Sequence, residues 1–106
     1  MNLRDLQEDM KSWLDHNFEP YESWQPLLGV VEELGELAHA HLKQSQNIRI
    51  EENHEEKIKD AIGDIIIFLV SYCNKRGFDL DKIVFDTWSK VKNRDWKEYP
   101  VNGVDK

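Results

Sequence analysis

Cysteine, glycine, proline and long apolar runs are all scarce in this chain of 106 residues. Its one cysteine, Cys73, cannot form an intrachain disulfide, which excludes a disulfide-stabilised scaffold and favours a reducing compartment. The longest apolar run, residues 61–73, is too short to span a bilayer and contains Asp64. The first ten residues contain no apolar segment typical of a signal peptide. We therefore expect a soluble, cytoplasmic protein without a membrane partner.

Basic residues are outnumbered by acidic ones. The chain has 21 acidic and 14 basic side chains, a net charge of −7, which argues against binding to the phosphate backbone of nucleic acids. Nucleotides stay possible ligands, because a bound divalent cation can reverse the local field. The length suits a single domain.

The few glycines and prolines fall where helices are expected to begin and end. Apolar residues spaced three and four apart predict helices from residue 3 to about 18, from 24 to about 44 and from about 54 to 76. A fourth helix is expected from residue 80, with Lys90, Lys92 and Arg94 at its end. Ser23 and Asp79 are suitable N-caps, and Gly77 is a suitable C-terminal stop. We find no pattern typical of paired strands. The sequence predicts an all-α fold with a four-helix bundle-like protomer over residues 1–96, followed by an extended tail over residues 97–106.

The third predicted helix is unusually apolar. From Ile62 to Val70 it has apolar side chains on nearly all sides. A small bundle cannot cover such a helix completely, so we expect a homodimer or homotetramer.

Two pairs of carboxylates lie on these helices. Glu33 and Glu36 share a face of the second helix, and Asp60 and Asp64 share a face of the third. An unpaired carboxylate within the Ile62–Val70 stretch would be costly, so Asp64 is expected to be paired, protonated or bound to a cation. If the pairs face each other, they form an all-oxygen site suited to Mg²⁺ or Mn²⁺. The alternatives are a solvated acidic patch and an ion pair between Asp64 and a basic residue of another helix.

Histidines allow a different metal site. Glu36 and His39 have the Glu-x-x-His spacing of di-iron bundles, as do Glu51 and His54. The second match spans a predicted loop and the start of a helix, which argues against it. A di-iron carboxylate protein and a non-catalytic oligomeric helical adaptor therefore remain alternatives to a magnesium enzyme.

From Trp24 to Trp96 the sequence resembles a known family. The segments VVEELGELAHAHLK, KDAIGDIIIFLVSYCNKRGFDL and WSKVKNRDW carry the resemblance. They are similar to the MazG-like branch of the all-α nucleoside triphosphate pyrophosphohydrolases. The resemblance implies a helical dimer or tetramer that hydrolyses (deoxy)nucleoside triphosphates to monophosphate and pyrophosphate with Mg²⁺. A role in cleaning the nucleotide pool follows from the same resemblance.

The family motif, EExxE followed by ExxD, can be carried over residue by residue. It makes Glu33, Glu36 and Asp64 metal ligands, with Glu32 as a further ligand or the catalytic base. The chain departs from the motif at Ala61, where the family has the Glu of ExxD. Asp60, one residue earlier, is the candidate for the missing ligand, since it lies on nearly the same helical face.

Substrate contacts are less sharply indicated. Lys90, Lys92 and Arg94 could supply positive charge for the outer phosphates, although basic residues also favour helix C-termini in general. Trp24 is the candidate for stacking on the base, although tryptophans in amphipathic helices more often pack in cores. The sequence does not discriminate between bases.

Overall fold

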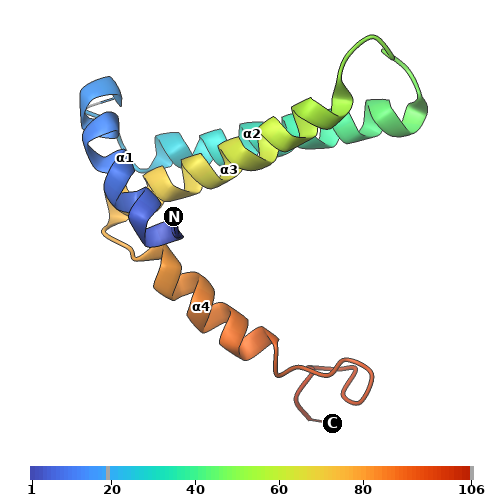
Figure 1. Ribbon diagram of the computed structural model, residues 1–106. Coiled ribbons are helices and arrows are strands. Elements are labelled where there is room, and N and C mark those ends of the chain that lie inside the picture. Colours follow the sequence, from blue (N-terminus) through green and yellow to red (C-terminus); the bar gives the residue numbers. More distant parts are fainter. Residues whose placement is uncertain (19, 106) are drawn as a thin grey trace.

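Four helices make up the regular structure of residues 1–18 and 20–105, the part of the chain that the computed structural model describes (Figure 1). They are α1 (Leu3–Phe18), α2 (Trp24–Gln46), α3 (His54–Arg76) and α4 (Leu80–Val91). This confirms the all-α class, and α2 continues two residues beyond its expected end. Of the described helices, none combines the length and the apolar character needed to cross a bilayer.

The helix ends follow local chemistry. The Asp79 carboxylate accepts a hydrogen bond from the backbone N–H of Lys82 at 3.2 Å, which makes it the N-cap of α4 as predicted. Gly77 ends α3 with φ of +70°, a left-handed conformation that glycine adopts without strain. Ser23 precedes α2 but makes no capping hydrogen bond with its side chain. The predicted residue therefore lies at the N-cap position, but its side chain does not cap the helix.

Helices α2 and α3 form an antiparallel hairpin and lie side by side along their lengths (Figure 1). Gly29 of α2 sits against Phe68 of α3, where an added Cβ would lie 2.6 Å from the ring. This contact fixes which residues of the two helices lie beside each other. One helical turn toward the α2–α3 loop is about four residues forward along α2 and four residues back along α3. Counting one turn from Gly29 and Phe68 places Glu33 beside Asp64, and counting a second turn places Glu36 beside Ala61. All four residues line the same cavity.

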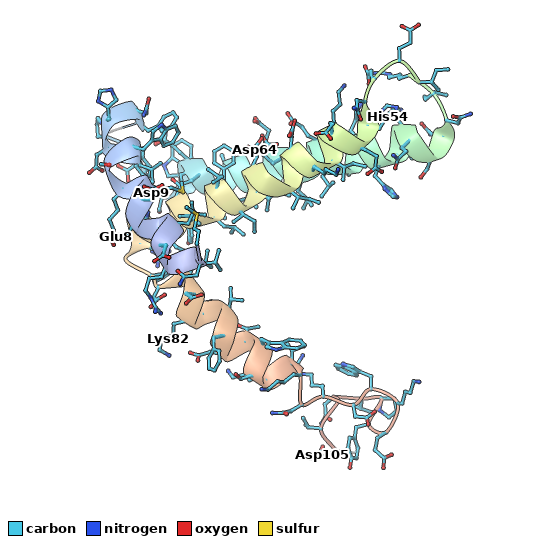
Figure 2. All side chains as sticks on the ribbon, in the orientation of Figure 1. Glu8, Asp9, His54, Asp64, Lys82 and Asp105 are labelled. Carbon is cyan, nitrogen blue, oxygen red and sulfur yellow. The ribbon has the colours of Figure 1, made fainter. Side chains whose placement is uncertain are left out.

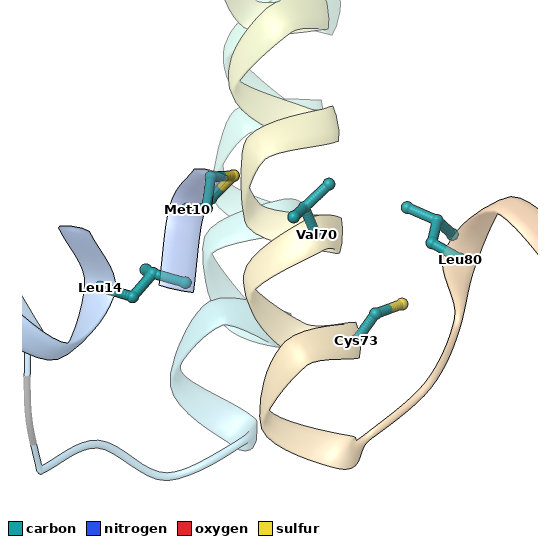
Figure 3. Packing of buried hydrophobic residues seen from close by; sticks show 5 residues of the cluster. All are labelled: Met10, Leu14, Val70, Cys73 and Leu80. Atoms are coloured by element: carbon teal, nitrogen blue, oxygen red, sulfur yellow. The ribbon is translucent and has the colours of Figure 1, made fainter. Parts of the chain in front are cut away.

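The buried core lies at the end of this hairpin, where α1 crosses α3 (Figures 1 and 3). Its side chains come from α1, α3 and the start of α4, namely Met10, Leu14, Val70, Cys73 and Leu80. The core is small, because α1 covers only this end of the hairpin.

A polar network also holds α1 to the α3–α4 junction. The buried Gln7 side chain donates to Asn74 Oδ1 at 3.0 Å and to the Phe78 carbonyl at 2.8 Å. Its Oε1 accepts from the backbone N–H of Leu80 at 2.9 Å. Gln7 therefore satisfies backbone groups that the tight turn between α3 and α4 leaves without helical partners.

Helix α4 projects away from the hairpin, so the four helices do not close into one bundle within the chain (Figure 1). The radius of gyration is 17.6 Å, against about 13 Å for a compact chain of this length. The accessible surface is 8104 Å², against about 6,200 Å² for a compact protein of this mass. Apolar side chains line the exposed faces, including Leu27, Leu28, Val31 and Leu34 on α2 and Ile83, Val84, Phe85, Trp88 and Val91 on α4.

The C-terminal segment is folded rather than extended. The backbone N–H of Asp95 donates to the Gly103 carbonyl at 2.7 Å, and that of Gly103 donates to the Tyr99 carbonyl at 2.8 Å. Gly103 is buried with φ of +82°, and a Cβ there would lie 2.8 Å from Arg94. These bonds close residues 95–103 into a loop at the end of the chain. The domain boundary at residue 96 stays a prediction, and Lys106 lies outside the described residues.

Candidate functional site

A cavity of about 580 Å³ lies between α2 and α3. It is lined by Glu32, Glu33, Gly35, Glu36, His39 and Ala40 of α2 and by Lys57, Asp60, Ala61 and Asp64 of α3. The structure therefore brings together all five carboxylates that the sequence singled out. It does so because the antiparallel register places the acidic stripe of α2 beside that of α3.

Among the described residues, three glutamates of α2 form a group that could hold a metal ion. One carboxylate oxygen from each of Glu32, Glu33 and Glu36 lies within 4.8 Å of the others. Glu33 is only 9% exposed, and its Oε2 atom is buried without a hydrogen-bond partner. Burial raises the pKa of Glu33, and the neighbouring Glu36 and Asp64 raise it further. An all-oxygen site whose buried oxygen has no donor suits a hard divalent cation.

Asp64 lies in a different environment from the one predicted. It is exposed, and its apolar neighbours Ile62 and Ile66 are 50% and 38% exposed. Within one chain the carboxylate therefore avoids the desolvation cost that the sequence analysis attributed to it. Among the described residues, Asp64 forms no ion pair with a basic side chain of another helix. Figure 2 shows Asp64 on the hairpin, away from α4.

The departure from the family motif falls on the wall of the cavity. Ala61 is 2% exposed and lines the cavity beside Asp60, which is exposed. Ala61 offers no ligand atom, so the carboxylates on the α3 side of the cavity are those of Asp60 and Asp64. Asp60 lies on the same cavity wall, where its carboxylate is available as a ligand.

Lys57 also lines this cavity, although no sequence motif had indicated it. Its Nζ lies 3.1 Å from Oε2 of Glu52, and this hydrogen bond lowers the pKa of Glu52. The signal for it was present, since Lys57 precedes Asp60 and Asp64 by spacings of three and seven on one helical face.

The proposed phosphate-binding residues lie elsewhere. Lys90 is in the last turn of α4, and Lys92 and Arg94 follow that helix. Helix α4 projects away from the hairpin (Figure 1), and none of these three residues is among those that line the acidic cavity. Trp24 is 57% exposed and is not among the residues that line the cavity.

A second cavity, of about 480 Å³, continues from the first toward α1. Glu33 and Asp64 line both cavities. Its other walls are mostly aromatic or apolar and include Trp13, Phe18, Tyr21, Pro26, Ile67 and Phe68. Gln25 adds an amide, whose Oε1 already accepts the backbone N–H of Glu22 at 2.7 Å. The arrangement offers an acidic site next to a space suited to a planar aromatic group.

The histidines do not form the paired arrangement of a di-iron site. His39 lines the acidic cavity, whereas His54 lies at the start of α3 with its Nε2 atom 3.0 Å from the Ile48 carbonyl oxygen. Within the described residues, the two Glu-x-x-His segments therefore do not meet at one centre.

Comparison with known proteins gives one clear result. Residues 23–97 match the sequence model of the MazG nucleotide pyrophosphohydrolase domain. No curated protein and no solved structure matches the chain. The matched segment covers α2, α3 and α4 and so includes every residue of the acidic cavity. The chain thus belongs to the family of MazG nucleotide pyrophosphohydrolase domains.

Proposed function

We propose that this protein hydrolyses (deoxy)nucleoside triphosphates to nucleoside monophosphate and pyrophosphate in a Mg²⁺-dependent reaction. The observation that carries the proposal is the buried Oε2 atom of Glu33, which has no hydrogen-bond partner and lies within a group of three glutamates. Such an atom is stabilised by a bound cation, and triphosphates occur as Mg²⁺ complexes. Family membership supplies the reaction class.

The residues present fit a divalent metal. Glu33, Glu36, Asp60 and Asp64 would hold Mg²⁺, and Mn²⁺ shares the preference for oxygen ligands. When bound, the metal polarises the α-phosphoryl group, lowers the pKa of a bound water and neutralises charge on the leaving pyrophosphate.

Glu32 is the candidate general base. It is exposed and lies next to the other two glutamates, so it can contact both solvent and the site. In the reaction, a water oxygen forms a bond to the α-phosphorus while the bond from that phosphorus to the α–β bridging oxygen breaks. The proton lost by the water passes to Glu32, and the electron pair of the broken bond leaves with pyrophosphate.

A second copy of the chain is part of the proposal. The large accessible surface and the exposed apolar faces of α2 and α4 support a homodimer or homotetramer. Lys90, Lys92 and Arg94 would then contact the outer phosphates in the site of another copy. Trp24 would contribute to base binding from the start of α2.

The proposal assigns the protein to nucleotide-pool cleaning in the cytoplasm. The unpaired Cys73 suits a reducing compartment, and the net charge of −7 disfavours a nucleic-acid partner. The proposal includes no membrane partner.

The test is product analysis with the purified protein, Mg²⁺ and a panel of nucleoside di- and triphosphates. We expect monophosphate and pyrophosphate from at least one triphosphate, and loss of turnover in Glu36→Gln and Asp64→Asn with helical circular dichroism retained. Full turnover by either folded variant would refute the assignment of the site. Absence of turnover, together with no Mg²⁺-induced rise in melting temperature, would favour the non-catalytic adaptor. Iron uptake with a charge-transfer band would favour the di-iron alternative.

A further inference from the structure

The two cavities divide the hairpin into chemically different halves. Glu33 and Asp64 lie where the cavities meet. Toward α1 the walls are aromatic and apolar, whereas toward the α2–α3 loop they are acidic with a single cationic side chain among the lining residues, that of Lys57. A nucleoside and a polyphosphate differ in the same way, since one is aromatic and the other is anionic.

The spacing along α3 matches this division. Lys57, Asp64 and Ser71 succeed one another at intervals of seven residues and line one face of the helix. At a rise of 1.5 Å per residue, Lys57 lies about 10 Å from Asp64 along the helix axis. Its flexible stem lets the ammonium group approach a chain of phosphates that begins at Asp64.

The present partner of Lys57 is one that a phosphate can replace. The Lys57 and Glu52 side chains are 54% and 37% exposed, and exposed ion pairs of this kind contribute little to stability. A phosphate group carries more charge than a carboxylate and offers more acceptor oxygens. Without Lys57, the β- and γ-phosphates would face Glu36 and Asp60, and no lysine or arginine would remain among the residues that line this cavity.

We propose that Lys57 binds the pyrophosphate end of the substrate, which lies along the hairpin with its nucleoside toward α1 and its outer phosphates toward the α2–α3 loop. The proposal rests on the proposed function for the identity of the ligand. It makes Lys57 a residue that discriminates triphosphates from monophosphates, because a monophosphate bound at Glu33 and Asp64 does not extend to it.

The test compares Lys57→Met with Lys11→Met in the full chain. Lys11 lies on α1, has a similarly exposed side chain and pairs with Glu8 as Lys57 pairs with Glu52, and it lines neither cavity of the hairpin. Calorimetry with Mg²⁺ and imidodiphosphate, a pyrophosphate analogue that resists hydrolysis, measures binding without turnover. We expect Lys57→Met to weaken imidodiphosphate binding by about tenfold, while deoxynucleoside monophosphate binding changes less than about twofold. Lys11→Met should leave both affinities unchanged.

A second variant separates phosphate binding from a merely structural role. If Lys57 acts only by tying Glu52 and the loop to α3, then Glu52→Gln should weaken imidodiphosphate binding as Lys57→Met does. Our proposal requires that Glu52→Gln retains or tightens it, because a competitor for the ammonium group is removed. Equal losses in Lys57→Met and Glu52→Gln would overturn the proposal, as would equal losses for imidodiphosphate and monophosphate.

The binding measurements can be interpreted whether or not the protein hydrolyses a triphosphate. Wild-type binding of imidodiphosphate that depends on Lys57, without hydrolysis of any triphosphate, would refute the proposed function and leave the role of Lys57 standing. If the wild-type protein releases pyrophosphate and Lys57→Met binds imidodiphosphate as tightly as the wild type does, the role of Lys57 is refuted and the proposed function stands. Failure of the wild-type protein to bind imidodiphosphate with Mg²⁺ would also refute it.

Discussion

Gly29 on α2 lies so close to the ring of Phe68 on α3 that a Cβ at position 29 would fall 2.6 Å from it. This close approach of backbone to side chain sets the register of the hairpin. One turn further along, the same register brings Glu33 level with Asp64. The geometry of the acidic cavity therefore depends on a residue that carries no functional group.

Gly29→Ala tests this dependence. The added methyl group must displace Phe68 or separate the helices, and overpacking of this kind costs about 1–3 kcal/mol. We expect a lower free energy of unfolding in urea and a weaker Mg²⁺-induced rise in melting temperature. Gly63→Ala is the matched control, since a Cβ there meets nothing within 4 Å. Its expected effect is a stabilisation of roughly 0.5–1 kcal/mol, because alanine favours helix. Wild-type stability of Gly29→Ala would contradict the close packing.

Glu33 should make the stability of the metal-free protein depend on pH. Burial and the nearby carboxylates raise its pKa in the folded chain above the ordinary value of 4.5. The folded state thus keeps this proton to higher pH than the unfolded state does. The resulting stabilisation is fully present below pH 4.5 and is lost as pH rises through the folded pKa.

Glu33→Gln should flatten that part of the pH profile, because a neutral amide replaces the titrating group. Melting temperatures recorded from pH 4 to 8 in chelator, for wild type and variant, provide the measurement. The same variant should lose most of the melting-temperature rise that Mg²⁺ causes. If the two pH profiles run parallel, Glu33 does not titrate as we describe.

Gln7→Leu should destabilise the attachment of α1. The substitution leaves the Phe78 carbonyl and the Leu80 N–H without the partners they have now. Unsatisfied buried groups cost about 1–3 kcal/mol each, so we expect a loss of at least ~2 kcal/mol in denaturant unfolding. Glu8→Leu, at the neighbouring exposed position, should change stability by less than about 0.5 kcal/mol. Similar losses in both variants would assign the effect to α1 in general and not to the Gln7 network.

Trp88→Glu should disrupt self-association. Trp88 is 58% exposed on the apolar face of α4, and a charge there opposes burial against a second copy. Sedimentation velocity at micromolar concentration should show a smaller species than the wild type, with reduced turnover because the basic residues after α4 no longer reach a partner. Thr87→Glu, at the adjacent exposed position, should retain the wild-type assembly. A monomeric wild-type protein would refute the expected oligomer directly.

Ala61→Glu should strengthen metal binding. It adds a carboxylate to the cavity wall beside Asp60, at the position where the chain departs from the family motif. We expect a severalfold lower Mg²⁺ concentration to give the same rise in melting temperature. The melting temperature in chelator should be lower than that of the wild type, because Ala61 is 2% exposed and the new side chain would be buried. Ala61→Gln matches it in size without the charge and should show only the second effect. Identical Mg²⁺ titrations of the two variants would mean that position 61 does not face the metal.

Local features of the fold were predictable because they depend on neighbours in sequence. Apolar spacing located all four helices, and Asp79 and Gly77 marked two of their ends correctly. Ser23 was placed correctly as the residue before α2, but its side chain makes no capping bond. Capping requires a particular backbone conformation as well as a hydroxyl group, and Ser23 has helical φ and ψ values instead.

Burial was less predictable than helix formation. Asp64 stands among apolar neighbours in the sequence, which suggested a buried carboxylate, yet it is exposed in the structure. Burial depends on which elements cover a face, and α4, which could have covered it, projects away from the hairpin (Figure 1).

The sequence by itself determined the helices and the acidic stripes along α2 and α3, because a helical period fixes which side chains share a face. Only the tertiary structure decided that the two stripes share one cavity, that Lys57 belongs to it, and that Lys90, Lys92 and Arg94 lie apart from it. The reason is physical: the direction and register of helix packing depend on contacts between distant residues, such as Gly29 with Phe68, which no local pattern specifies.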